Sequence, residues 1–593
     1  MKLPTDVVKM YKEVHGWVGI LSGLCLFIAF YAGALTMFEL PLQRWASPPP
    51  ALAPAPSLDR TPELVAKAIA AHPEAAKGYE IHLRTDAAHP ARMSWTVRDP
   101  EDHHGGGTTH YAALAPDGAL QVVTQGPSQV AQLIDVLHQQ VGLPFDHEIS
   151  MPIMGGIALL YMIAIVSGLV VLLPSLVSDL FALRIGRNVK RMWLDLHNVL
   201  GLFSLPFHII MALTAVVFAF HDQFYDAQGM AFGGGERGGR PAMAAPAEGP
   251  PPATLTPAQI VARVREQAPG FTPQTLVYGR GGGGLPALRV QGSDDRYGVR
   301  APSYGMAGVD PQTGAITATD YMPGMQDGWS ATITSFFALH FGNFGGATIR
   351  WAYFLLGLAG AFLFYTGNLL WVESRRRKER KDGAVDQTRA TRILGALTVG
   401  VPLGCVAGIS VTLAAAKLLG GHASYGMHSA IYYALFLLAT FWALVRGAAR
   451  AGVELSVLGA VAMLCVPLAS LIAGADWYDA PALMLVDGVA LLLALALLWS
   501  ARAARHRART GPRDSVWSDR REPSLGAPER GAGGGRSLKT AQHRAASPSR
   551  IVASRPRARS RASSSLSASF LSCASAPRSI STDRPPCCAS IRT

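Results

Sequence analysis

His15-Gly-Trp-Val-Gly-Ile-Leu21 begins one long apolar run of this chain, and His197-Asn-Val-Leu-Gly-Leu-Phe203 begins another. Each run is followed by a long polar segment, then by a Leu-His pair containing His138 or His340, and then by a further apolar run. This order occurs twice, which predicts an internal repeat of a two-helix unit. Both copies start on the same side of the predicted membrane, so the repeat is parallel, with its pseudo-twofold axis along the membrane normal.

The composition is typical of a polytopic membrane protein. The chain has 593 residues, of which 49% are hydrophobic and 16% are charged. An apolar run of about 20 residues is long enough to cross a bilayer as a helix. We expect about eight such transmembrane helices, at about 14–38, 152–174, 192–220, 349–372, 393–416, 425–446, 453–474 and 480–501.

Basic residues cluster at alternate ends of these runs, which predicts the orientation. Lys and Arg accumulate on the cytoplasmic side of membrane proteins. All five clusters fall on one side, so we expect both termini in the cytoplasm and the two long segments on the outer side. The clusters are Lys2, Lys9 and Lys12; Arg184, Arg187, Lys190 and Arg191; residues 375–381; Arg446 and Arg450; and Arg502, Arg505, Arg507 and Arg509.

The two long outer segments have the same predicted organisation. Each starts with a helical pattern, continues with β-like runs and ends with a hairpin signal, Ala115-Pro-Asp-Gly-Ala-Leu120 or Val309-Asp-Pro-Gln-Thr-Gly-Ala-Ile316. Glycine in these turns supplies the positive φ that a tight hairpin requires. We therefore expect two small α+β modules beside an all-α bundle. The predicted boundaries are 1–40 (first helix), 41–151 (first module), 152–220 (two helices), 221–348 (second module), 349–372 (fourth helix), 393–501 (four helices) and 509–593 (basic tail).

The basic charge of the chain does not indicate a nucleic-acid partner. The tail 509–593 has 16 Lys and Arg against 5 Asp and Glu, and so contributes +11 of the formal net charge of +13. Its Ser, Arg, Ala and Pro content is typical of disorder. The six cysteines form no CxxC motif, which makes an iron–sulfur site or a disulfide framework an unfavourable interpretation.

Four histidines are the strongest candidates for chemistry. His15 and His197 begin equivalent apolar runs, and His138 and His340 precede equivalent runs. An ionisable residue at a membrane helix is costly and is a functional candidate by default. Imidazole pairs held between helices are also a common way to ligate haem iron. We therefore predict that these histidines ligate haem iron, His15 and His197 near the cytoplasmic side and His138 and His340 near the outer side.

His208 is a further candidate for cofactor binding. It lies eleven residues after His197, on nearly the same face of a straight helix and about 16 Å further along it. It could ligate a separate haem, complete the outer site with His138 or His340, or line the electron path. The equivalent position in the first run is Leu26, so the repeat does not support a ligand there.

These motifs resemble the family of PepSY-associated transmembrane proteins, also described as iron-regulated or iron-uptake membrane proteins. The resemblance rests on His15-Gly-Trp-Val-Gly-Ile-Leu21, Leu196-His-Asn-Val-Leu-Gly-Leu202, Leu339-His-Phe-Gly-Asn-Phe-Gly-Gly346 and the ending 309–316, and covers about residues 10–375. It implies a bacterial inner-membrane protein with two b-type haems and two PepSY-like periplasmic modules. It also implies an oxidoreductase that takes electrons from an unknown donor and reduces ferric siderophore in the periplasm.

Two alternatives remain open at the level of sequence. The first is a membrane cytochrome that passes electrons to another periplasmic acceptor. The second is a transporter or partner-binding membrane protein without redox activity, because a parallel-repeat bundle is compatible with transport.

Overall fold

A computed structural model gives the architecture. It describes residues 4–48, 52–86, 89–98, 107–176, 184, 189–221, 223, 254–280, 286–297, 305–381, 386–474 and 481–519. All of these belong to one compact unit, Met1–Pro523, and the second unit, Ser524–Thr593, lies outside them.

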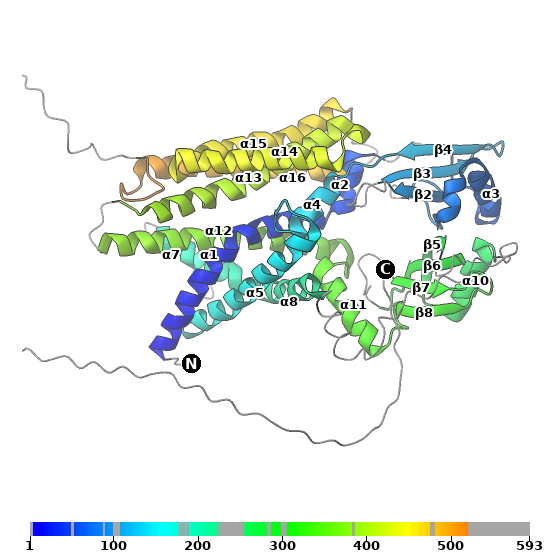
Figure 1. The fold of residues 1–593 in the computed structure, drawn as a ribbon, viewed down its shortest axis with the longest axis horizontal. Coiled ribbons are helices and arrows are strands. Elements are labelled where there is room, and N and C mark those ends of the chain that lie inside the picture. Colours follow the sequence, from blue (N-terminus) through cyan, green and yellow to red (C-terminus); the bar gives the residue numbers. More distant parts are fainter. Residues whose placement is uncertain are drawn as a thin grey trace, which may run out of the picture. The chain divides into compact units, whose positions relative to one another are not determined.

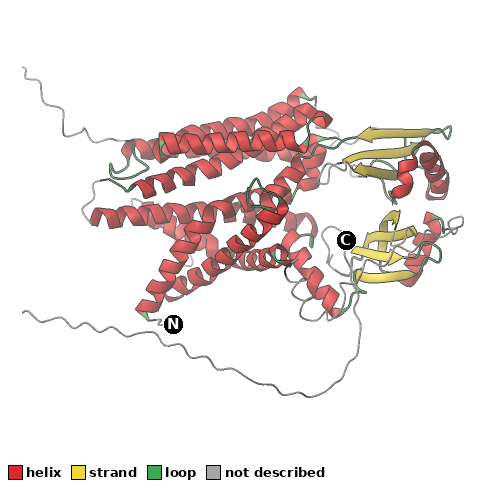
Figure 2. Ribbon diagram, in the orientation of Figure 1, coloured by secondary structure: helices red, strands yellow, loops and turns green. Residues whose placement is uncertain are grey.

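Long apolar helices dominate the described chain (Figures 1 and 2). Seven are long and apolar enough to cross a membrane, and a bent pair brings the number to as many as eight. The prediction of a polytopic helical membrane protein is therefore confirmed. The seven helices are α1 (Thr5–Thr36), α5 (His147–Leu172), α12 (Gly346–Lys381), α13 (Arg389–Leu419), α14 (Tyr425–Arg446), α15 (Ala448–Ile472) and α16 (Pro481–Thr510).

The third predicted span is broken. It consists of α7 (Val189–Phe203) and α8 (Leu205–Ala219), and their axes are bent by 69°. The break lies at Ser204, whose hydroxyl donates to the Leu200 carbonyl oxygen at 2.5 Å. Pro206 follows in the first turn of α8, and because proline lacks an N–H it cannot continue the hydrogen bonds of the preceding helix. The expectation of a straight helix from His197 to His208 is therefore wrong.

Three shorter helices connect the spans to the outer segments: α2 (Glu39–Ala46), α4 (Val130–Gln139) and α11 (Gly328–Phe341). In α4 the apolar residues recur at the spacing of one helix face. That face includes Val130, Ile134 and Leu137, which are buried in a cluster that also contains Ile28 and Tyr31 of α1. This packing fixes α4, which carries His138, against the first membrane helix.

The strands of both outer segments form a single antiparallel sheet. Its order is β4-β3-β2-β1-β5-β6-β7-β8, and β1 pairs with β5 so that Ile81 lies opposite Leu276. Each outer segment contributes four consecutive strands, and the β1–β5 pairing joins the two sets edge to edge in one continuous ladder, which the sequence analysis did not foresee. The strands are β1 (Tyr79–His82), β2 (Met93–Arg98), β3 (Gly107–Leu114), β4 (Leu120–Gln125), β5 (Thr272–Arg280), β6 (Pro286–Ser293), β7 (Gly305–Val309) and β8 (Ile316–Tyr321).

One face of the sheet packs against two helices, α3 (Thr61–Ala71) and α10 (Pro257–Gln267). Leu64 and Ile260 of these helices share a buried core with Ile81 and Leu276 of the sheet. Both predicted hairpins are confirmed: β3 pairs with β4 and β7 pairs with β8. Gly118 and Gly314 in the turns have φ angles of 81° and 73°, which favour glycine.

The last four spans pack closely on one another, as Figure 1 shows for α13 to α16. Helix α16 extends to Thr510, and Trp517 beyond it is 7% exposed in a core with Val372 of α12. Residues 509–519, which the sequence analysis placed in the tail, therefore belong to the packed structure. The rest of the predicted tail, 520–593, lies outside the described residues.

Candidate functional site

The structure brings His15 of α1 and His197 of α7 together. Their ring centres are 6.2 Å apart and their ring planes are inclined by 72°. Both side chains line one cavity, together with His208. The two histidines are 182 residues apart in the sequence. Their rings nevertheless lie close together, as the prediction of a first ligand pair requires.

Each ring of this first pair uses Nδ1 for a hydrogen bond to a neighbouring helix. His15 Nδ1 lies 2.9 Å from the Ala164 carbonyl oxygen in α5, which can only accept. His197 Nδ1 lies 3.1 Å from the Thr366 hydroxyl in α12, whose own proton is donated to the Leu363 carbonyl oxygen at 2.8 Å. Both rings therefore donate from Nδ1, and the lone pair of each neutral ring is on Nε2.

Glycines make room for these rings. A Cβ atom at Gly168 of α5 would lie 2.9 Å from His15 Cε1, and a Cβ atom at Gly367 of α12 would lie 3.4 Å from His197 Cε1. Ser167 precedes the first glycine and Thr366 the second, and each hydroxyl lies within 3.4 Å of the facing Nδ1. The same hydroxyl-glycine pair thus meets the histidine in both helices.

The second predicted pair is also brought together. The ring centres of His138 and His340 are 5.9 Å apart, with planes inclined by 38°. His138 Nδ1 donates to the Ala29 carbonyl oxygen of α1 at 2.8 Å, and His340 Nδ1 lies 2.7 Å from the Thr214 hydroxyl of α8. The Thr214 hydroxyl donates to the Ile210 carbonyl oxygen at 2.7 Å, so it accepts from His340. Nε2 is again the unprotonated nitrogen of both rings.

The spacing of both pairs fits two imidazoles on opposite sides of one metal ion. With each metal–nitrogen bond about 2.0 Å long, the ring centres of such a pair lie about 6 Å apart. Among the described residues no group of three or more His, Cys, Asp or Glu side chains could hold a metal ion. A bare ion usually needs about four ligands, so two imidazoles alone suit a metal that brings its other ligands with it, as haem iron does.

The first pair opens into a cavity of about 1130 Å³, which we call the histidine cavity. Its walls are largely apolar, and Gly16, Gly19 and Gly201 leave space beside the two histidines. Gly23 does not share this role, because a Cβ atom there would lie 3.0 Å from Asn368 Oδ1. One end of the cavity is basic: its described lining there consists of Lys9, Lys12, Lys190, Arg191, Arg375 and Lys378 beside Glu13.

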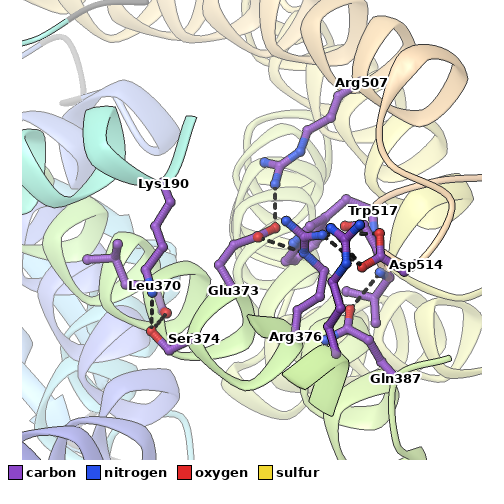
Figure 3. Close-up of polar contacts among 12 residues, drawn as sticks. Lys190, Leu370, Glu373, Ser374, Arg376, Gln387, Arg507, Asp514 and Trp517 are labelled. Carbon is purple, nitrogen blue, oxygen red and sulfur yellow. Dashed lines mark hydrogen bonds and ion pairs between the residues drawn. The ribbon is translucent and has the colours of Figure 1, made fainter. Parts of the chain in front are cut away.

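Polar contacts fix the helices at the basic end of the cavity (Figure 3). Lys190 donates to the Ser374 hydroxyl at 2.9 Å. In the adjoining turn, Glu373 is 6% exposed and pairs with Arg376 of its own helix and Arg507 of α16, each at 3.0 Å. Arg376 also pairs with Asp514 at 3.0 Å. The end of α16 and the segment after it thereby hold α12 in place beside the cavity.

His208 lies between the His15–His197 pair and the part of α1 that binds His138. It is 2% exposed, its Nδ1 lies 2.5 Å from the Tyr161 hydroxyl, and its Nε2 has no hydrogen-bond partner among the residues that the structure describes. Its ring packs against Phe30 of α1 at 5.6 Å between centres, next to Ala29, which binds His138. His208 lines the histidine cavity, and no ring contact joins it to His138 or His340 within the described residues.

The sequence of the chain was compared with models of known protein families. A sequence model of the PepSY-associated TM region matches residues 12–374. The chain belongs to this family. The match covers α1 to α12, and therefore both histidine pairs and the eight-stranded sheet. No curated protein matches the chain.

The residues that orient the histidines were not identified from the sequence. Thr214, Thr366 and the carbonyl groups of Ala29 and Ala164 bind the four Nδ1 atoms. A backbone carbonyl leaves no sequence signal. The repeated Ser167-Gly168 and Thr366-Gly367 dipeptides do leave one, because they place a hydroxyl and a glycine at equivalent positions of two spans.

Proposed function

We propose that this protein is an inner-membrane b-type dihaem protein that moves electrons from the cytoplasm to the periplasm and reduces ferric siderophore there, releasing iron. The proposal rests on two pairs of facing imidazoles. The ring centres lie 6.2 Å apart in the His15–His197 pair and 5.9 Å apart in the His138–His340 pair. All four rings donate from Nδ1 to a helix and leave Nε2 unprotonated, which is the arrangement expected of ligating histidines.

The equivalent contacts of the two pairs support the internal repeat. His15 and His197 each meet a hydroxyl-glycine dipeptide in the next span of their own half. His138 and His340 each donate to the first span of their own half, at Ala29 and at Thr214. We therefore propose that residues 1–175 and 189–381 are parallel repeats, each supplying one ligand to each haem.

The charges around the histidine cavity support the proposed orientation. Six basic side chains at its end match the cytoplasmic accumulation of Lys and Arg. The same groups suit the two carboxylates of a haem, because Arg and Lys form strong charge-assisted hydrogen bonds with carboxylates. On this orientation the sheet and the His138–His340 pair lie on the periplasmic side.

A bound haem would supply one-electron redox chemistry, which no amino-acid side chain of the pair provides. The chain's own residues would bind the iron, orient the imidazole rings and exclude water from the region between the two pairs. His15, His197, His138 and His340 would hold the haem iron, and their Nδ1 partners fix the orientation of the imidazole rings. Along α1, His15 and Ala29 are separated by about 21 Å at 1.5 Å per residue. Phe30, Tyr161, Phe207, His208 and Phe364 fill this region with closely packed rings that exclude water.

The choice of a ferric chelate as the electron acceptor follows the family resemblance and the chemistry of iron. Siderophores hold Fe(III) through hard oxygen ligands, and one-electron reduction to Fe(II) gives a less charged ion that such ligands bind less tightly. A protein that delivers single electrons on the periplasmic side therefore suffices to release the metal.

Anaerobic stopped-flow spectroscopy tests this function. Purified protein reduced with a stoichiometric amount of dithionite is mixed with a ferric trihydroxamate, and with a quinone in a parallel experiment. We expect rapid reoxidation of the haem bands by the chelate, with Fe(II) trapped by ferrozine in equal amount. Reoxidation by quinone alone would contradict the proposal and favour a membrane cytochrome with another acceptor. A well-folded, haem-supplied preparation without haem would contradict any redox role.

A further inference from the structure

A second cavity, of about 970 Å³, lies between the sheet and the helices α2 and α4. We call it the sheet cavity. The sheet contributes the face that α3 and α10 leave uncovered: Ile81 and Met93 belong to the core with these helices, so their neighbours Glu80 and Ser94 point to the other face. This volume is within the range of cavities that bind small molecules, about 300–1,000 Å³.

The walls of the sheet cavity are polar and carry charge of one sign. Glu39 of α2, Glu80 of β1 and Asp135 of α4 line it. Among the described residues of its lining there is no Lys or Arg, although the chain has a formal charge of +13. The three carboxylates come from separate segments of the chain, and no ion pair within the described residues joins Glu39 to a basic side chain. A cation inside the cavity would supply the charge that the walls lack.

The pKa values of these three carboxyl groups are raised, as expected where negative charges are close together and no cation balances them. Glu39 is exposed to the cavity, but the surrounding protein and the charge of Asp135 raise its pKa to about 7. Burial raises the pKa of Asp135 and of Glu80 as well. Both effects disfavour the ionised form, and a bound cation would relieve them.

The position of the sheet cavity connects it to the second histidine pair. Asp135 and Gln132 line the cavity from α4, and His138 follows Asp135 by one helical turn, about 4.5 Å along the axis. Helix α4 thus presents a carboxylate to the cavity and an imidazole to His340. A ligand in the cavity would lie beside the group that the second pair holds.

We propose that the sheet cavity binds the substrate and selects ferric chelates that carry a positive charge. The identity of the ligand as a ferric chelate rests on the proposed function, whereas its charge rests on the cavity walls. Neutral chelates would bind more weakly, and anionic chelates of the tris-catecholate type would be excluded by like charge.

Equilibrium dialysis with the oxidised full-length protein in a non-ionic detergent tests this proposal. The probes are a linear ferric trihydroxamate with a free ammonium group, its cyclic neutral counterpart and an anionic ferric tris-catecholate. We expect the cationic chelate to bind at least about tenfold more tightly than the neutral one, with an affinity that falls as salt is added. Equal affinities for the cationic and neutral chelates would overturn the proposal.

Substitutions locate the binding site. Glu39→Gln and Glu80→Gln should each weaken binding of the cationic chelate by roughly three- to tenfold, the range of a partly solvated charge contact, and leave the neutral chelate unaffected. The matched control is Glu266→Gln on α10, whose carboxylate is 70% exposed and pairs with Arg263. Glu39→Lys should lower the preference for the cationic over the anionic chelate further than Glu39→Gln does. Equal effects of the cavity and control substitutions would place the binding elsewhere.

The haem spectrum of every variant separates this inference from the proposed function. Two haems with no charge-selective binding would refute the sheet cavity as a substrate site and leave electron transfer intact. Charge-selective binding by a protein without haem would support the cavity and refute the redox function.

Discussion

The histidine cavity and the sheet cavity have similar volumes, about 1130 and 970 Å³, but their walls have opposite chemistry. The first is apolar, holds three imidazoles and is basic at its end; the second is polar, acidic and has no imidazole ligand pair in its wall. The difference indicates what each can retain. The first suits a flat apolar group with carboxylates, bound permanently. The second suits a soluble cation that enters and leaves.

We expect the largest effect from removing one of the predicted haem ligands, because this should abolish haem binding at one histidine pair and leave the sheet cavity unchanged. His197→Ala removes one of the two facing imidazoles at the histidine cavity and should lower the haem content from about two to about one per chain. His340→Ala should do the same at the second pair, with loss of the other haem's absorption band. Pyridine haemochrome assays measure the content. His221→Ala, at an exposed histidine just beyond α8, is the control and should retain both haems.

Filling the space beside a ligand should have nearly the same effect. Gly168→Val places side-chain atoms where even a Cβ atom would lie 2.9 Å from His15 Cε1, so the ring must move and the first haem should be lost or become five-coordinate. Gly156→Ala in the same helix is the matched control, because nothing lies within 4 Å of a Cβ atom there. Resonance Raman spectra report the coordination number. Identical spectra for both variants would show that His15 is not a ligand.

Loss of an Nδ1 partner should weaken haem binding without abolishing it. Thr214→Val keeps the shape of the side chain but removes the hydroxyl that accepts from His340. Outer partners of this kind typically contribute about 10- to 100-fold in metal affinity. Haem transfer to apomyoglobin measures the affinity. The control is Thr332→Val, which removes a hydroxyl that donates to the Gly328 carbonyl oxygen of its own helix. Equal transfer rates in the two variants would argue against His340 ligation.

The smallest expected effect is the pH dependence of the sheet cavity. Because the pKa of Glu39 is raised to about 7, its carboxylate gains charge between pH 6 and 8, and binding of the cationic chelate should strengthen by up to about tenfold. The other carboxyl groups that line the cavity, Asp135 and Glu80, also have raised pKa values and gain negative charge in the same direction as the pH rises. Glu39→Gln should flatten the profile measured by equilibrium dialysis. Binding that weakens as pH rises would contradict an anionic site.

Local patterns in the sequence were sufficient to predict the membrane helices and to predict which four histidines come together. An apolar run of 20 residues and a His-bearing repeat are properties of short segments, and the four predicted ligands do meet in two pairs. The ligand roles themselves stay a prediction until haem is measured. The two hairpins were predicted for the same reason, since a glycine turn is a local requirement.

Features that depend on distant segments were missed. The pairing of Ile81 with Leu276 joins strands 195 residues apart, and nothing in either outer segment alone specifies that register. The acidic sheet cavity assembles Glu39, Glu80 and Asp135 from three elements. Each of these arises from tertiary packing, which periodicity does not encode.

The most direct test of the account is the dithionite-reduced minus oxidised visible spectrum of detergent-purified protein, with haem stoichiometry per chain. The account predicts split or broad b-type bands from about two haems in unlike surroundings. A well-folded preparation from haem-supplied cells that contains no haem would contradict the central claim that the two histidine pairs are iron ligands.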